Sequence, residues 1–282
     1  MKTYLDCIPC FFKQALLAAR SATDDERAIK RILDRVGLLV PDIPLTATPP
    51  ETARLLYRIV REETGVFDPL KRIKEESTRK ALALYPSLKA EIEEAEDPLQ
   101  QAVRIAIAGN VIDFGANPDL DLDSAVRAVL LRNFGIHHHK AFKEKLDQAE
   151  TVLYLADNAG ETVFDRLLIE TMGRPVTYVV REKPIINDAT KEDALAAGLQ
   201  EWAEVISSGC DAPGTILPQC SEEFRERFHS ADLIISKGQG NFETLSEEKG
   251  PLFFLFMAKC PIIATHAGVE MGTLNLMEAQ AS

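Results

Sequence analysis

Two features of the sequence predict an α/β fold with an all-α N-terminal part. Up to about Phe134 the apolar residues recur at helical spacing, which is typical of amphipathic helices. After Glu150 short β-branched apolar runs alternate with helical stretches, which is typical of a parallel sheet with crossover helices. We therefore expect a helical bundle at residues 1–149. A Rossmann-like three-layer α/β/α sheet domain is expected to pack on it, at residues 150–282.

The helical part is divided by residues that break helices. The segment from Pro41 to Pro50 contains four prolines, and Asp68-Pro69 and Asp97-Pro98 each stand before a further periodic segment. A proline is well tolerated in the first turn of a helix, and an aspartate before it can cap the helix. We predict that a helix begins at each of these two Asp-Pro pairs and that this half contains no strand.

The sheet part contains five runs that we expect to form strands buried on both faces. They are Thr151 to Ala156, Pro175 to Val180, Glu204 to Ser207, Leu233 to Ser236 and Pro261 to Thr265. Helices are expected between them, for example at Thr162 to Met172 and at Lys191 to Ala197. Ligands of such sheets bind beyond the carboxyl ends of the strands, so chemistry is expected in the residues that follow each strand.

Composition excludes several classes of function. The 282 residues include 32 Lys and Arg against 44 Asp and Glu, a net charge of −12, so nucleic acid is not expected as a partner. The longest apolar run, Leu252 to Ala258, is far shorter than the roughly 20 residues of a membrane span. The first residues lack the apolar core of an export signal. We expect a cytoplasmic protein, monomeric or homodimeric, with its five cysteines reduced.

The first expected strand ends in Asp157-Asn158-Ala159-Gly160-Glu161. Carboxylate and amide oxygens are suitable ligands for Mg²⁺, Mn²⁺ or a related divalent ion. The start of the following helix offers N–H groups to an anion. This pattern predicts a joint metal and phosphate site. The alternative is a simple turn at Asp157-Asn158, with Glu161 complementing the helix dipole.

The second expected strand leads to Asp188, a further candidate metal ligand. Aspartate is also among the best residues to cap a helix. Asp188 could therefore serve only as the N-cap of the helix that follows. Both interpretations remain open from this segment alone.

The fourth expected strand runs into Lys237-Gly238-Gln239-Gly240-Asn241. Two glycines let the backbone approach a ligand closely, and the lysine supplies a positive charge. The segment is typical of a phosphate cradle, although it is neither a P-loop nor a dinucleotide fingerprint. The alternative is a glycine turn with an incidental surface lysine.

In the helical part, Asn110 and Asp113 are three residues apart and would share one helix face. Both are candidates to point into the same cleft as the strand ends. Asn110 stands among isoleucines and valines, so a buried structural amide is an equal alternative.

Taken in chain order, five motifs resemble one family, the metal-dependent damage-control phosphatases, formerly a domain of unknown function. They are Cys7-Ile8-Pro9-Cys10, Gly109-Asn110 with Ile112-Asp113, Asp157 to Glu161, Lys183-Pro184 with Asn187 to Thr190, and Ser236 to Glu243. The resemblance extends from Cys7 to about Thr265, and the CxxC pair is similar to that of the archaeal and bacterial branch.

The resemblance implies a divalent metal ion, Mn, Co, Ni or Mg, held by Asp157, Asn158 and Asp188. It implies hydrolysis of phosphate monoesters of small metabolites, such as sugar phosphates or damaged phosphometabolites. Matching positions place Lys237 and the glycine loop beside the phosphate.

Asp113, Glu161 or a free oxygen of Asp157 is expected to orient the attacking water, and the sequence does not choose among them. Direct attack by Asp157 is a further alternative. A non-catalytic nucleotide or sugar-phosphate binding protein is the competing function, because a doubly wound sheet does not establish catalysis. A carboxyl methyltransferase is disfavoured, since no glycine-rich cofactor turn follows Asp157.

Overall fold

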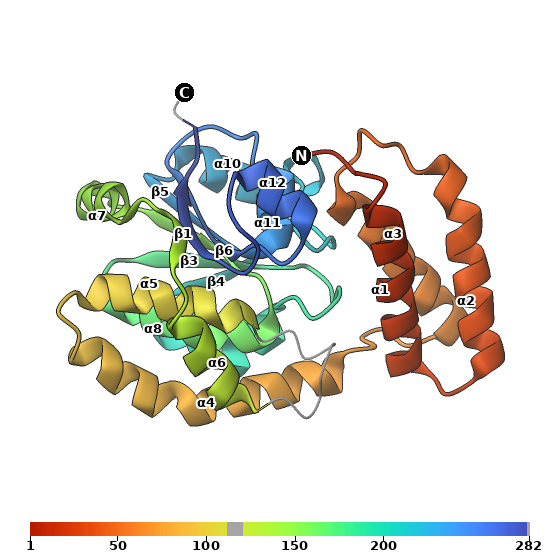
Figure 1. Ribbon diagram of the computed structural model, residues 1–282, viewed down its shortest axis with the longest axis horizontal. Coiled ribbons are helices and arrows are strands. Elements are labelled where there is room, and N and C mark those ends of the chain that lie inside the picture. Colours follow the sequence, from red (N-terminus) through yellow and green to blue (C-terminus); the bar gives the residue numbers. More distant parts are fainter. Residues whose placement is uncertain (112–120, 281–282) are drawn as a thin grey trace.

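The computed structural model describes residues 1–111 and 121–280, and in this part of the chain a mixed sheet lies between two layers of helices (Figure 1). The strands are β1 (Phe134–His137), β2 (Val152–Leu155), β3 (Val176–Val180), β4 (Glu204–Ser207), β5 (Leu233–Lys237), β6 (Leu252–Met257) and β7 (Leu274–Glu278). The α/β fold predicted from the sequence is confirmed.

The helices of the described residues fall into an N-terminal group and two layers on the sheet. The first seven are α1 (Cys7–Ala22), α2 (Glu26–Leu39), α3 (Pro49–Thr64), α4 (Lys71–Glu93), α5 (Pro98–Ala108), α6 (Leu122–Leu130) and α7 (His139–Gln148). The remainder are α8 (Thr162–Met172), α9 (Lys191–Ala196), α10 (Glu222–Ser230), α11 (Gly238–Leu245) and α12 (Pro261–Ala267).

The strand order is β1-β7-β6-β5-β2-β3-β4. Strands β2 to β6 are parallel to one another where they pair, whereas β7 runs antiparallel to β6. From β2 the chain proceeds to β3 and β4 on one side, and it later crosses to β5 and β6 on the other side. The junction of β2 and β5 is therefore the topological switch point, where ligands bind in open α/β sheets.

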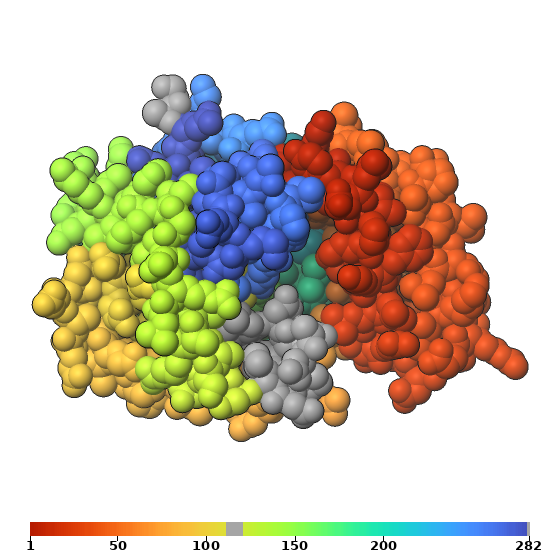
Figure 2. All heavy atoms as spheres, in the orientation of Figure 1, coloured from red at the N-terminus to blue at the C-terminus, as the bar shows by residue number. Residues whose placement is uncertain are grey.

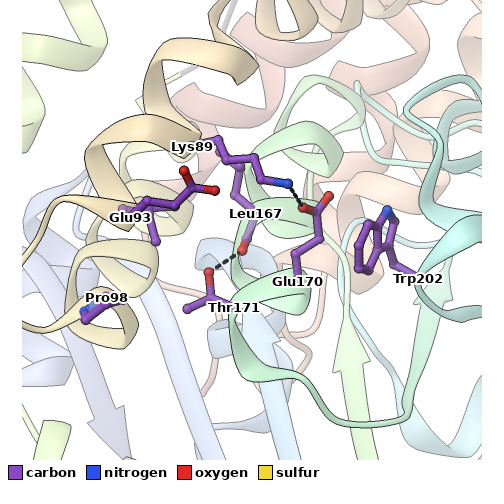
Figure 3. A pocket seen from close by; sticks show the side chains of 8 residues that line it. Lys89, Glu93, Pro98, Leu167, Glu170, Thr171 and Trp202 are labelled. Atoms are coloured by element: carbon purple, nitrogen blue, oxygen red, sulfur yellow. Dashed lines mark hydrogen bonds and ion pairs between the residues drawn. The ribbon is translucent and has the colours of Figure 1, made fainter.

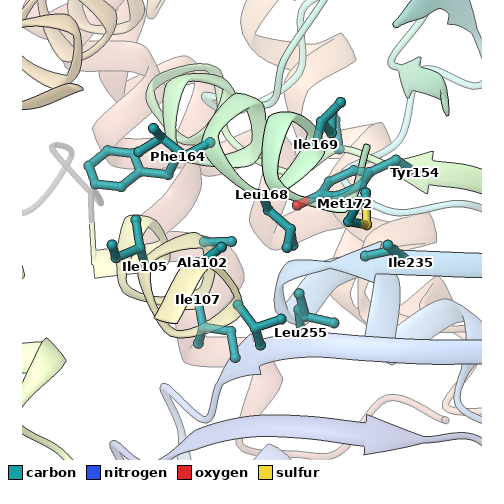
Figure 4. Close-up of a cluster of buried hydrophobic side chains, with 14 of the residues drawn as sticks. Ala102, Ile105, Ile107, Tyr154, Phe164, Leu168, Ile169, Met172, Ile235 and Leu255 are labelled. Carbon is teal, nitrogen blue, oxygen red and sulfur yellow. The ribbon is translucent and has the colours of Figure 1, made fainter. Parts of the chain in front are cut away.

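Each strand of the sheet centre sends alternate residues to opposite faces, as the period of a strand requires. Val152 and Tyr154 join the core under α4, α5 and α8, while Leu153 and Leu155 join the core under α10 to α12. Figure 4 shows the first of these cores, in which Phe164 and Leu168 of α8 lie against α5 and the sheet. Two cores explain why the central strands are apolar on both sides.

Helices α1, α2 and α3 form a third core of their own, and Ile185 from the loop after β3 is buried in it. Figure 2 shows the surface hollowed between the red N-terminal helices and the blue C-terminal segment. The helical group therefore holds one of the loops at the carboxyl ends of the strands. The domain boundary expected at residues 149 and 150 stays a prediction.

Local signals explain several helix ends. Asp97 accepts a hydrogen bond from the Gln100 amide and caps α5, as predicted from Asp97-Pro98. The expected helix at Thr162 to Met172 is α8, which ends where Gly173 takes a left-handed conformation. The helix expected after Asp68-Pro69 begins at Lys71.

Two predictions about the sheet were wrong, and strands β6 and β7 were not predicted. The run from Pro261 to Thr265 forms helix α12 with Pro261 in its first turn, because a short apolar run after a proline suits a helix start equally well. The strand at this place in the sheet is β6, the long apolar run itself. The N-terminal half also supplies β1, which pairs with β7, so that half is not free of strands.

None of the helices within residues 1–111 and 121–280 combines the length and the apolar character that crossing a bilayer requires.

Candidate active site

Three crossover segments meet at the carboxyl ends of β2, β3 and β5. In the sheet register, Leu155 of β2 stands beside Val179 on one side and Ser236 on the other. Asp157, Arg181 and Lys237 follow or end these strands and are all buried. The switch point thus collects the polar residues that the sequence places at strand ends.

Asp157 lies at the centre of this arrangement. Its Oδ2 accepts hydrogen bonds from Asn110 Nδ2 at 2.9 Å and from Asn158 Nδ2 at 3.2 Å. The Asp157 carboxylate also lies against Gly238, where a Cβ would collide with it. Gly238 has a φ of +79°, which a side chain disfavours. Only glycine fits here, because it permits both the backbone conformation and the close approach.

Asp188 is brought beside Asn158 by backbone pairing. The two residues form an isolated bridge, and the amide of Ala189 donates to the Asp157 carbonyl at 2.7 Å. Helix α9 is capped by Thr190, in a capping box with Asp193. The alternative that Asp188 is the N-cap is therefore wrong, and its carboxylate is available to the site.

Arg181 is a site residue that the sequence analysis missed. Its Nε donates to Asp188 Oδ2 at 2.8 Å, and its two Nη atoms donate to Thr215 Oγ1 at 3.2 Å and to Asn241 Oδ1 at 3.0 Å. The residue as a whole is 2% exposed. A charged residue at the end of a strand gives no signal by itself that it turns inward.

Glu161 holds the two asparagine amides in place. Its Oε1 accepts from Asn110 Nδ2 at 2.7 Å and from Asn158 Nδ2 at 2.6 Å, and its Oε2 accepts from Lys237 Nζ at 3.0 Å. Both oxygens of Glu161 are thus engaged with protein donors. Because both amide nitrogens point to Glu161, the amide oxygens of Asn110 and Asn158 point away from it.

Lys237 forms a second ion pair with Asp165 Oδ1 at 2.5 Å. Asp165 was also missed, although it lies one helical turn after Glu161, a spacing that places both on one face. Its carboxylate accepts from Tyr154 OH at 2.8 Å and from Tyr178 OH at 2.7 Å. Burial would lower the pKa of Lys237, but Asp165 and Glu161 outweigh it and raise the pKa.

The buried charges of the site do not balance. The buried carboxylates are Asp157, Glu161, Asp165 and Asp188, whereas the buried cations that form ion pairs with them are Arg181 and Lys237. Burial, together with Glu161 and Asp188, raises the pKa of Asp157 well above its usual range. Burial also raises the pKa of Asp188, to about 6, although Arg181 opposes the shift. A divalent cation would offset the two excess negative charges.

Helix α11 begins at Gly238, directly after β5. Buried contacts hold its first turn in place. Asn241 has no exposed surface, and its amide group donates to the carbonyls of Ala156 and Lys237 at 3.0 and 2.8 Å. A Cβ at Gly240 would collide with the Pro213 carbonyl. Gln239 donates to Glu243 at 2.9 Å and accepts from the Lys259 amide at 3.2 Å. The predicted contacts of residues 237–241 with a substrate stay predictions.

Asn110 closes the site from the helical side, in a 3₁₀ turn at Gly109–Val111 just after α5. Its Oδ1 is fully buried and has no hydrogen-bond partner among residues 1–111 and 121–280. Buried amide oxygens are normally paired, so this orphaned atom is consistent with a missing cation or water. Asp113, the other residue expected here, lies outside the described residues.

Within residues 1–111 and 121–280, no three His, Cys, Asp or Glu side chains are grouped as metal ligands. The expected ligand set of Asp157, Asn158 and Asp188 differs from such a group because one of its members is an amide. The donor chemistry still fits, since hard carboxylate and amide oxygens are what Mg²⁺ and Mn²⁺ prefer.

A hollow of about 380 Å³ lies elsewhere, between α4, α8 and Trp202 (Figure 3). Lys89 and Glu170 form an ion pair there at 2.8 Å. The hollow is bounded by the C-terminal half of α8, whereas Glu161 and Asp165 stand at the opposite end of that helix. No predicted site residue lines it.

A family model described as the damage-control phosphatase ARMT1-like domain matches residues 3–274. The chain is 37% identical to a damage-control phosphatase of Pyrococcus horikoshii, covering 98% of both chains. It is 33% identical to a damage-control phosphatase of Archaeoglobus fulgidus, covering 95% of this chain and 96% of that one.

A crystal structure of a DUF89 family protein from Pyrococcus horikoshii has the same fold, with a TM-score of 0.90 at 36% identity. The match covers 99% of this chain and all of that one. Family model, relatives and fold agree over nearly the full length. This chain therefore belongs to the damage-control phosphatase family, and residues 3–274 form its ARMT1-like domain.

Proposed function

We propose that this phosphatase is a divalent-metal-dependent hydrolase of phosphate monoesters of small metabolites, such as sugar phosphates or damaged phosphometabolites. The observation that carries the proposal is the excess of buried carboxylate charge at the switch point of the sheet. Such a site is unfavourable without a cation, and the oxygens around it are hard ligands.

In this proposal Asp157, Asn158 and Asp188 hold the metal ion. When bound, the ion would act as a Lewis acid on a phosphate oxygen and lower the pKa of a coordinated water. The candidate ions are Mn²⁺, Co²⁺, Ni²⁺ and Mg²⁺. Its place beside two fixed amides is supported by the hydrogen bonds from Asn110 and Asn158 to Glu161.

The chain's own residues have separate roles. Glu161 holds the two amides, because both its oxygens already accept from protein donors. Asp157 Oδ2 accepts the two amide bonds, so Oδ1 is the oxygen left either to hold the metal ion or to orient the attacking water. Asp113 stays a further candidate for this role.

The phosphate is proposed to bind at the start of α11. The first N–H groups of a helix lack partners within the helix and attract anions. Gly238 and Gly240 add no side chain of their own to this backbone, which packs closely against the Asp157 carboxylate and the Pro213 carbonyl. Lys237 lies behind the loop and adds positive charge without direct exposure. Electrostatic positioning of this kind is the main contribution of a protein to phosphoryl transfer.

The test is release of phosphate from an aryl phosphate by the purified protein, with and without each of the four metal ions. Activity that requires a metal ion and is lost in Asp157→Ala is expected. Asp34→Ala is the matched control, because its carboxylate is exposed on α2, and it should retain full activity. Binding of sugar phosphate or nucleotide without turnover would instead support the non-catalytic alternative.

A further inference from the structure

We propose that Arg181 is a positioning residue that fixes Asp188 for the metal ion and ties it to Asn241 of α11, the helix at which the phosphate is proposed to bind. This inference rests on the proposed function, because it assigns Arg181 a task at the proposed metal site. It goes beyond the five motifs of the resemblance, none of which includes Arg181.

The guanidinium of Arg181 divides its hydrogen bonds among three side chains. Nε donates to one oxygen of Asp188, while Nη1 and Nη2 donate to Thr215 and Asn241. Asp188 Oδ2 is thereby committed to Arg181, and Oδ1 is left for the metal ion. A ligand held in this way presents one oxygen in a fixed orientation, which is the usual contribution of groups behind a metal ligand.

The ion pair between Arg181 and Asp188 is buried. The side chains of Arg181 and Asp188 are 1% and 4% exposed. Buried ion pairs are often no more stabilising than apolar side chains of similar volume. Folding alone therefore gives little reason for an arginine at this position, whereas orientation of a charged ligand does.

The ion pair also closes the loop of residues 181–188. Arg181 and Asp188 stand at its two ends, and between them Ile186 has a φ of +46°. Of the described residues other than glycine, it is the only one with a positive φ. A β-branched residue in this region is strained, so the surroundings must hold it there. Arg61 does so from α3, by donating to the Pro184 carbonyl at 2.9 Å.

Arg181 is also linked to α11 through Asn241. Thr215 Oγ1 donates to Asn241 Oδ1 at 2.8 Å, so this oxygen accepts from both Thr215 and Arg181. The amide nitrogen of Asn241 in turn donates to two backbone carbonyls. Asn241 therefore cannot rotate without losing bonds, and Arg181 joins Asp188 to helix α11, which begins at Gly238. A lysine has no planar fork and cannot reproduce the three contacts.

The experiment measures the dissociation constant for Mn²⁺ by the electron paramagnetic resonance signal of the free ion. It compares the full-length protein with Arg181→Met, Arg181→Lys and Arg104→Met. Arg104 is the matched control, because its half-buried guanidinium donates to the carbonyls of Leu130 and Arg132, outside the site. Melting temperatures in chelator, and kcat and KM with an aryl phosphate, are recorded for each variant.

Arg181→Met is expected to weaken Mn²⁺ binding about 10–100-fold, as loss of a group behind a metal ligand typically does. Arg181→Lys should lie between Arg181→Met and the unaltered protein, and it decides the matter if the methionine variant does not fold. Arg104→Met should lower the melting temperature without changing the Mn²⁺ dissociation constant.

Unchanged Mn²⁺ affinity in both Arg181 variants would overturn the inference and leave Arg181 a structural residue. Tighter binding would also overturn it, because the guanidinium would then only oppose the charge of the ion. If the unaltered protein binds no Mn²⁺ and releases no phosphate, the proposed function itself fails. That result is distinct from a failure confined to the Arg181 variants.

Discussion

Lys237 Nζ lies 3.0 Å from Glu161 Oε2, and neither side chain has any exposed surface. The lysine also pairs with Asp165, so its charge is largely committed inside the protein. The resemblance implied a lysine beside the phosphate. The geometry adds that this lysine also pairs with two buried carboxylates, and the two roles can be separated by experiment.

Replacing Lys237 by methionine should destabilise the protein by about 3–5 kcal/mol, the usual cost of removing one partner of a buried ion pair. Glu161 and Asp165 would then be buried without a counter-ion. The measurement is urea unfolding in the presence of chelator. Native stability with only a higher KM would show that Lys237 acts on the phosphate alone.

Lys89→Met is the control for this experiment. Lys89 also pairs with a carboxylate, that of Glu170, but its side chain is 41% exposed. Exposed ion pairs contribute about 0–1 kcal/mol, so this variant should unfold close to the unaltered protein. An equal loss in both lysine variants would contradict the assigned importance of burial.

Gly238→Ala should abolish Mn²⁺ binding and phosphate release, because the new methyl group would displace the Asp157 carboxylate. Gly173→Ala is its control. Gly173 also has a positive φ, of +59°, but a Cβ there would meet no atom within 4 Å. Both variants incur the backbone cost of about 1–2 kcal/mol. Retained Mn²⁺ affinity in Gly238→Ala would argue against Asp157 as a ligand.

Asn110→Ala should lower kcat about 10–100-fold, because a donor to the expected metal ligand Asp157 is lost. Asn275→Ala is the control, since Asn275 is equally buried but donates to the Thr273 carbonyl at 3.0 Å, next to β7. It should lower stability and leave kcat unchanged. A similar kcat for both variants would favour the interpretation of Asn110 as a purely structural amide.

The sequence allowed the strand ends of the site to be predicted because polar residues stand out after apolar runs. Strand β4 was predicted with its observed bounds, Glu204 to Ser207, and α8 likewise. Strand β6 was missed, because six consecutive apolar residues show no period that separates a buried strand from a buried helix. Strand β1 is only half-buried and short, so its pattern is weak.

Asp165 and Arg181 were missed for a different reason. A charged side chain in a helix or at a strand end is usually solvated, and no local pattern says otherwise. Both turn inward because partners distant in the sequence receive them, namely Lys237 for Asp165 and Thr215 for Arg181. Knowledge of the sheet order is needed before such pairs can be anticipated.

Glu243 on α11 gives a prediction about pH. Burial raises the pKa of its carboxyl group to about 7, although the hydrogen bond from Gln239 opposes the shift. In the unfolded chain the pKa of a glutamate is about 4.3. Between these two pH values the folded protein binds the additional proton, so this group makes stability fall as the pH rises from about 4 to about 7.

Glu243→Gln removes this effect and keeps a similar shape. The variant should therefore gain stability relative to the unaltered protein as the pH is raised from 5 to 8, measured by urea unfolding in chelator. Asp97→Asn should instead keep a constant stability difference from pH 5 to 8, because the Gln100 amide and His139 hold the pKa of Asp97 below its usual value. Its stabilising contribution is present above about pH 4 and is lost as the pH falls. A constant stability difference for Glu243→Gln over this range would show that Glu243 is not held protonated in the folded protein.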